Sequence, residues 1–312
     1  MHTIKTFAPV VIPTLCRYKH FKRCIESLAK CTFAQQTELV IGLDYPAKEA
    51  HFEGYEKIKK YLSNISGFAK VTVLEAEKNL GAIDNSLLLK KYAFANYDIY
   101  IYTEDDNEFS PCFLDFMNQA LEKYKENERV TSVCAYTNPQ YTAKKISGNV
   151  VFIYDSSAWG IGLWKNKEDS YDQKCLRFNK QAKKFLVQLK LLKYYPMLLR
   201  AVLDMLISGE DYADVRRSAL NVINDTYQIR PHKSMVRNWG HDGTGEHCGR
   251  QKEKFEKAEI IQDESFNLYD KVPIVRTKTL DKAVFRNMLP QKMINKIKIY
   301  IGILYKMIKS QL

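Results

Sequence analysis

The residues best suited to chemistry lie at positions 102–108, where the sequence reads Tyr-Thr-Glu-Asp-Asp-Asn-Glu. Four acids fill five positions, Glu104 to Glu108, directly after a β-rich apolar run at 98–102. Carboxylates crowded at the end of a buried strand repel one another and lose hydration, so they need a positive partner. Mg²⁺ or Mn²⁺ would supply it, because hard divalent cations prefer carboxylate oxygens. The alternative is a solvated acidic turn that caps the next helix, but the position at a strand end favours the cation site.

Other polar residues follow the neighbouring apolar runs. Arg17 follows the run at 8–13, where a guanidinium would suit a phosphate or a nucleobase edge. Asp44 ends the run at 38–43 and could accept hydrogen bonds from a ribose or a base. The alternatives are a surface arginine among lysines and an aspartate in a turn, and the sequence leaves both open.

A third group comes after the run at 70–74. Gly81 would let the backbone approach a ligand, and Asn79 and Asn85 offer amide donors. The same three residues would also suit a turn followed by a helix cap.

Two further features lie later in the chain. The acid pair Glu210 and Asp211 could supply a general base, or could cap a helix whose dipole favours acids. Trp159 could offer an apolar face to a sugar ring, or could be a core aromatic residue.

The elements that position these residues alternate along the first half of the chain. Strands are predicted at 8–13, 38–43, 70–74, 98–102 and 130–136, and helices at 19–30, 54–62, 84–95 and 111–124. This order predicts an α/β fold with a mostly parallel sheet covered by helices on both faces. Because such sheets bind ligands at the carboxyl ends of their strands, Arg17, Asp44, Asn79 and Glu104 should gather at one edge.

The pattern loosens after residue 145. A strand is predicted at 150–154, and a helix followed by a strand at 220–230. The apolar stretch 180–207 should split into two helices at Pro196. Four glycines at 238–249 mark a loop, and the chain is helical again from about 288.

Composition limits the function classes. The chain has 312 residues, 46% hydrophobic and 27% charged, which excludes a disordered or fibrous protein. The net charge of +12 indicates anionic partners, but positions 275–312 alone hold nine basic residues and one acid. This concentration argues against nucleic-acid binding over the whole surface. Seven cysteines without a C-x-x-C pair predict reduced thiols and a cytoplasmic protein, and we expect no signal peptide and no spanning helix.

Six segments in order resemble the nucleotide-sugar glycosyltransferases of the GT-A fold, family 2. They are VVIPTLCRYKHFKRCIESL, NLGAIDN, TEDDNEFSPCFLDF, SSAWGIGLW, SGEDYADVRR and RPHKSMVRNWG. The EDD segment is similar to that of the N-acetylglucosaminyltransferases that start complex N-glycans. The resemblance spans roughly residues 8–250.

The resemblance implies a Rossmann-like catalytic domain over 1–250 and a basic extension over 251–312. Within the domain, 8–145 would bind the nucleotide sugar, and 146–250, with a helical insert at 180–207, would carry the acceptor and the base. Residues implied in donor binding are Arg17, Asp44, Asn79, Gly81, Asn85, Glu104 and Asp105. Asp106 would bind Mn²⁺ or Mg²⁺, with a late histidine, His241 or His247, as a second ligand; the alternative for each is a polar histidine in a loop. Asp211, beside Glu210, would be the base, and Trp159 would contact the acceptor.

The implied reaction is an inverting transfer from a nucleoside-diphosphate sugar, with UDP as the nucleotide, to a saccharide or lipid-linked saccharide. Bacterial surface polysaccharide or lipopolysaccharide synthesis is the implied setting. One alternative is a nucleotidyltransferase that makes a sugar nucleotide, although no glycine-rich phosphate loop follows the first predicted strand. Another is a non-catalytic protein that binds a membrane surface.

The predicted C-terminal helix is basic and amphipathic. It would place six apolar residues on one face, with lysines on its flanks: Met293, Ile297, Tyr300, Ile301, Leu304 and Ile308. Such a helix suits an anionic membrane surface, here the inner face of the membrane, through 288–312. It could equally pack on the catalytic domain.

Overall fold

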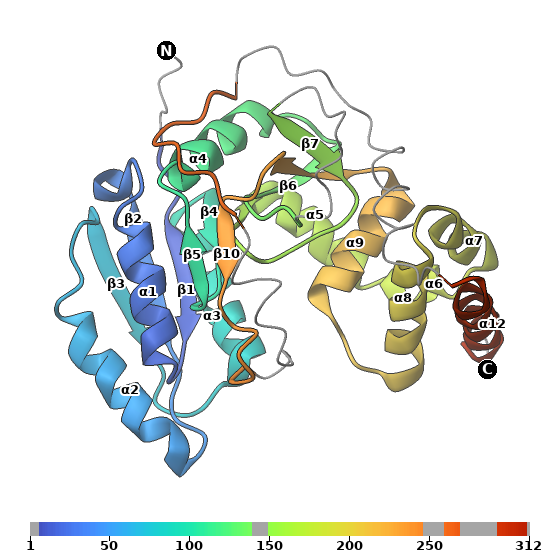
Figure 1. The fold of residues 1–312 in the computed structure, drawn as a ribbon, viewed down its shortest axis with the longest axis horizontal. Coiled ribbons are helices and arrows are strands. Elements are labelled where there is room, and N and C mark those ends of the chain that lie inside the picture. Colours follow the sequence, from blue (N-terminus) through green and yellow to red (C-terminus); the bar gives the residue numbers. More distant parts are fainter. Residues whose placement is uncertain (1–5, 139–148, 246–258, 269–291, 311–312) are drawn as a thin grey trace.

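The structure is a computed structural model that describes residues 6–138, 149–245, 259–268 and 292–310 (Figure 1). Its strands are β1 (Val10–Thr14), β2 (Glu38–Leu43), β3 (Lys70–Glu75), β4 (Ile99–Tyr102), β5 (Asn107–Phe109), β6 (Val130–Cys134), β7 (Val150–Ile153), β8 (Ile161–Trp164), β9 (Tyr227–Pro231) and β10 (Val236–Asn238). Its helices are α1 (Tyr18–Leu28), α2 (Glu49–Leu62), α3 (Gly81–Asn96), α4 (Phe113–Tyr124), α5 (Lys165–Cys175), α6 (Phe178–Ala182), α7 (Phe185–Tyr194), α8 (Pro196–Ser208), α9 (Ala213–Asn224) and α12 (Met293–Lys309), with a short 3₁₀ turn at Ala34–Gln36.

Eight strands form one mixed sheet in the order β3-β2-β1-β4-β8-β6-β9-β7. The first four strands are parallel, as the alternating pattern predicts. The predicted β6 does not lie next to β4, because β8 is inserted between them and runs antiparallel to both. The α/β class with a mostly parallel sheet is confirmed, and the sheet continues without a break across the predicted division at residue 145.

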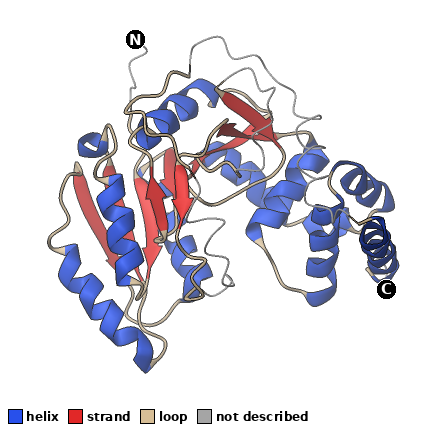
Figure 2. Ribbon diagram, in the orientation of Figure 1, coloured by secondary structure: helices blue, strands red, loops and turns tan. Residues whose placement is uncertain are grey.

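Helices cover both faces of the sheet (Figure 2). Consecutive residues of a strand point to opposite faces, so neighbours in β1 belong to different apolar clusters. Val10 and Ile12 belong to the larger core cluster, which includes α1 and α4. Val11 belongs to the smaller cluster on the other face, where Leu89 and Ala93 of α3 pack. Strand β1 is thus packed between two apolar clusters, one on each face of the sheet.

Helices α6 to α9 and α12 form a lobe beside the sheet (Figure 1). Pro196 is the first residue of α8 and separates it from α7, so the predicted split of the apolar stretch is confirmed. Helix α12 packs on α8, which confirms the predicted C-terminal helix. Among the helices that the structure describes, none is long and apolar enough to cross a membrane.

A two-stranded ribbon that the sequence does not predict brings a distant loop to the site. In this ribbon β10 pairs antiparallel with β5, and Asn238 lies opposite Asn107. The loop that follows β10 is thereby placed beside the end of β4.

Candidate functional site

The predicted acidic segment lies at the carboxyl edge of the sheet, with Arg17 against it. The Arg17 guanidinium forms ion pairs with Asp105 and with Asp106, the latter at 2.8 Å. Thr14 Oγ1 donates a hydrogen bond of 2.9 Å to the other Asp105 oxygen. The two buried carboxylates raise the pKa of Arg17, although burial alone would lower it. The sheet therefore brings the ends of β1 and β4 together, as predicted.

The remaining side of Asp106 is closed by the loop after β10. Asn238 Nδ2 donates a hydrogen bond of 2.7 Å to Asp106 Oδ1, and the Trp239 backbone N–H donates to the Asp106 carbonyl oxygen at 2.9 Å. Gly240 is required here, because a Cβ atom at that position would collide with Asp106 Oδ2. The sequence marks this segment as a glycine-rich loop and as the end of the resembling segment RPHKSMVRNWG, but it does not reveal the contacts of Asn238 and Gly240 with Asp106.

These contacts test whether the site suits a divalent cation. Both oxygens of Asp106 are already used, one by Arg17 and one by Asn238. Within the described ranges, no three His, Cys, Asp or Glu side chains gather in a way that could hold a metal ion. Arg17 supplies one positive charge against the two carboxylates of Asp105 and Asp106, so a divalent cation would have to share or displace it, and Mn²⁺ or Mg²⁺ at Asp106 stays a prediction.

His241 and Trp159, predicted for the metal and the acceptor, lie against each other. Their ring centroids are 5.8 Å apart in an edge-to-face arrangement, and Trp159 also packs on Tyr136 at 4.5 Å. Trp159 is half-buried. The structure thus places the edge of one ring against the face of the other; a metal contact by His241 and an acceptor contact by Trp159 stay predictions, and His247 lies outside the described residues.

Asp44 organises the turn before α3. Its carboxylate accepts hydrogen bonds from the backbone N–H groups of Tyr45, Leu80 and Gly81 at 2.8–2.9 Å. Asn79 Nδ2 donates to the same carboxylate at 3.3 Å, and Gly81 has the positive φ of 79° that this turn needs. The arrangement matches the alternative of a turn and a helix cap.

Asn85 ties α3 to the sheet. It is buried, and its Nδ2 donates a hydrogen bond of 2.9 Å to the Gly42 carbonyl oxygen. This contact gives Asn85 a structural role, and a contact with the donor stays a prediction.

One further acid, Asp214, acts electrostatically on the acidic segment. Burial and the charges of Asp106 and Asp214 raise the pKa of Glu104. Asp214 stands in the first turn of α9, within SGEDYADVRR, three residues after Asp211. The residue is exposed, while the protein around its carboxylate and the nearby Asp155 raise its pKa to about 6. Asp214 is therefore an acid whose proton affinity suits acid–base chemistry near neutral pH.

The predicted acid pair lies in the exposed segment before α9. Asp211 forms an ion pair with Arg216, and Glu210 accepts a hydrogen bond from the Tyr212 hydroxyl. Both acids are exposed. No contact in the described residues joins either of them to Glu104, Asp105 or Asp106.

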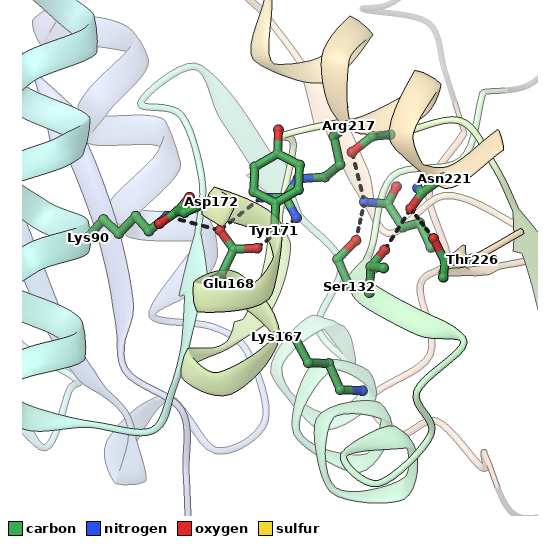
Figure 3. A network of polar contacts seen from close by, with 12 residues as sticks. Lys90, Ser132, Lys167, Glu168, Tyr171, Asp172, Arg217, Asn221 and Thr226 are labelled. Carbon is green, nitrogen blue, oxygen red and sulfur yellow. Dashed lines mark hydrogen bonds and ion pairs between the residues drawn. The ribbon is translucent and has the colours of Figure 1, made fainter. Parts of the chain in front are cut away.

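A buried ion pair fixes α9 to the rest of the domain (Figure 3). Arg217 donates two hydrogen bonds to Glu168 of α5, at 2.7 and 2.9 Å, and stacks on the Tyr171 ring at 3.7 Å. Lys90 of α3 lies 3.2 Å from the same carboxylate. Burial alone would raise the pKa of Glu168, but Arg217 and Lys90 lower it. Arg217 is one turn after Asp214, so this pair sets the position of the candidate base.

Comparisons with known proteins complete this description. No protein-family model and no curated protein sequence matches the chain. A structure of S. aureus TarS has 18% identity and a TM-score of 0.36, over 49% of this chain and 27% of that one. TarS 1–349 has 14% identity and a TM-score of 0.44, over 97% and 80%.

The mannosyltransferase PcManGT from Pyrobaculum calidifontis, in complex with GDP-Man and Mn²⁺, has 12% identity and a TM-score of 0.38, over 51% and 45%. This chain thus spans less than half of PcManGT and a smaller part of full TarS. Similarity at this level assigns no function to the chain. The function proposed below rests on the geometry of the site.

Proposed function

We propose that the chain transfers a sugar from a nucleoside-diphosphate donor to a hydroxyl group of a saccharide acceptor. One arrangement supports this above the others: Arg17 meets Asp105 and Asp106 at the carboxyl edge of an α/β sheet, next to Glu104, whose pKa the charge of Asp214 raises. Arg17 could contact a diphosphate that displaced Asp105 or Asp106 from it, carboxylates accept hydrogen bonds from sugar hydroxyls, and an acid with a raised pKa can take a proton. These are the groups that a direct sugar transfer needs.

In the proposed step, the base removes the proton from the acceptor hydroxyl as its oxygen attacks the anomeric carbon. The bond between that carbon and the phosphate oxygen breaks, and the nucleoside diphosphate leaves with the electron pair. A single displacement of this kind inverts the anomeric carbon. The carboxylates near the sugar would stabilise the positive charge that develops on the ring.

We propose Asp214 as the base, because it is the acid of the α9 region that lies near Glu104. Asp211, assigned from the resemblance, stays a prediction and provides the matched comparison three residues away. Mn²⁺ or Mg²⁺ also stays a prediction, and no step above depends on it, since Arg17 holds Asp106. UDP as the nucleotide and a role in bacterial surface polysaccharide synthesis follow from the resemblance alone.

The test combines donor binding with transfer. Thermal unfolding is measured with nucleoside diphosphates and nucleotide sugars, with and without Mn²⁺; a ligand at 100 times its Kd should stabilise the fold by about 2.7 kcal/mol. Asp214→Asn should keep that stabilisation and lose transfer by roughly 10²-fold or more, whereas Asp211→Asn should keep both. Absence of stabilisation by any nucleotide would refute a donor site. Release of pyrophosphate instead of a nucleoside diphosphate would favour the nucleotidyltransferase alternative.

A further inference from the structure

Helix α12 is fixed to the protein by one face. Ile303 and Met307 are buried in the main core cluster against α8. Lys306 forms an ion pair with Asp204 of α8, and Ser310 accepts a hydrogen bond from Gln188 of α7 at 3.2 Å. These contacts set the rotation of the helix about its axis, and therefore which residues face outward.

The outward face of α12 is apolar. Ile294, Ile297, Ile301, Leu304 and Ile308 recur at helical spacing, and their exposed fractions run from 46% to 70%. Single apolar side chains on a surface are ordinary, but a continuous stripe marks an interaction surface. These five residues are called the outer stripe below.

The sequence left two alternatives open for this helix, binding to a membrane or packing on the domain. In the structure one face of α12 packs on the domain while another face stays exposed, so the two alternatives do not exclude each other. The packing face includes Ile303 and Met307, which the predicted apolar face does not include. All six members of that predicted face stay exposed after α12 has packed. Figure 1 shows α12 at the outer edge of the helical lobe, beside α7. Two apolar residues at the start of helix α7, Phe185 and Leu186, are exposed as well.

Every charged residue of α12 itself is a lysine, and of these Lys306 is paired with Asp204 of α8. Positions 292–310 contain five lysines and no acid: Lys292, Lys296, Lys298, Lys306 and Lys309. A second copy of this chain would bring the same lysines against these, so repulsion opposes self-association through this face. An anionic lipid bilayer presents the opposite charge and an apolar interior. Lysine side chains at the edge of an apolar stripe can reach the headgroups while the stripe enters the acyl region.

We propose that the outer stripe of α12 binds the surface of an anionic lipid bilayer, with the helix axis parallel to the membrane plane. This inference goes beyond the proposed function and does not depend on it, because the surface lies on the helical lobe and contains none of the residues proposed for sugar transfer. It would hold the protein against a membrane.

The test is flotation of the full chain with vesicles of phosphatidylcholine, and with vesicles that also contain phosphatidylglycerol. The chain should float with the anionic vesicles and far less with the neutral ones. Ile301→Glu and Leu304→Glu should each lower partitioning by about tenfold or more, since burial of one such side chain is worth at least that factor. Both side chains are exposed, so the fold should be retained, which circular dichroism checks.

Two controls separate the proposal from its rivals. Leu87→Glu changes a comparably exposed leucine on α3, at 55%, and should float like the parent chain. Lys298→Gln with Lys309→Gln should reduce binding to anionic vesicles only. Equal flotation of Ile301→Glu and the parent, or equal binding to both kinds of vesicle, would overturn the proposal. So would a dimer, seen by light scattering, that Ile301→Glu dissociates without any vesicle binding. The readout needs no donor, so failure of the proposed transfer would not affect it.

Discussion

Replacing Arg217 by methionine should strongly destabilise the domain. The change removes both hydrogen bonds to Glu168 and the stacking on Tyr171, and it leaves Glu168, with 2% of its side chain exposed, facing only Lys90. Removing one partner of a buried ion pair costs about 3–5 kcal/mol. Because Lys90 remains within 3.2 Å, we expect the lower part of that range, about 3 kcal/mol.

The loss should depend on pH in a defined direction. In the parent chain the pKa of Glu168 lies below its ordinary value of 4.5, so the pair stabilises the fold above that pH. This stability disappears as the pH falls through the lowered pKa. Without Arg217, burial should push the pKa of Glu168 above its ordinary value. The destabilisation should therefore be larger near pH 8 than near pH 5, by about 1 kcal/mol or more.

The assay is urea unfolding followed by tryptophan fluorescence at both pH values. Arg216→Met is the matched control, since Arg216 pairs with the exposed Asp211 and should cost at most about 1 kcal/mol. Glu168→Leu combined with Arg217→Met should recover most of the loss, because no buried charge is then left alone. A cost for Arg217→Met no larger than that for Arg216→Met would refute the buried ion pair.

Two further predictions concern the site. If Asp214 is the base, kcat/KM should fall as the pH drops below about 6, where the carboxylate takes up a proton, and Asp214→Asn should remove this acid limb from the residual activity. A limb that persists in Asp214→Asn would assign it to another group. Arg17→Gln should bind Mn²⁺ more tightly than the parent chain in titration calorimetry, since it frees the Asp105 and Asp106 oxygens that Arg17 now holds. Equal affinities would show that Arg17 does not compete with a cation.

Much of the first half of the fold follows from local sequence. The buried runs that became β1 and β2 are apolar almost throughout, as strands covered on both faces must be. The helices between these strands are predicted because their apolar residues recur at helical spacing. The meeting of Arg17 with Asp105 and Asp106 follows from placing these strand ends at one edge.

Non-local pairing explains what the sequence does not reveal. Strands β5 and β10 have three residues each, and their polar side chains carry no periodic signal. The position of β8 between β4 and β6 depends on topology, which apolar runs do not encode. The role considered for Asp214 was missed for a different reason, the predicted start of a helix. The predicted helix began near residue 220, whereas α9 begins at Ala213 and carries Asp214 in its first turn.

The insertion of β8 also affects how the chain folds during synthesis. Strand β4 ends at Tyr102, but β8, which covers its edge, begins at Ile161. At a translation rate of about 5–20 residues per second, the edge of β4 would stay open for roughly 3–12 seconds. An uncovered strand edge can pair with other chains. The nascent chain therefore presents an open strand edge until residues 161–164 leave the ribosome and close the sheet.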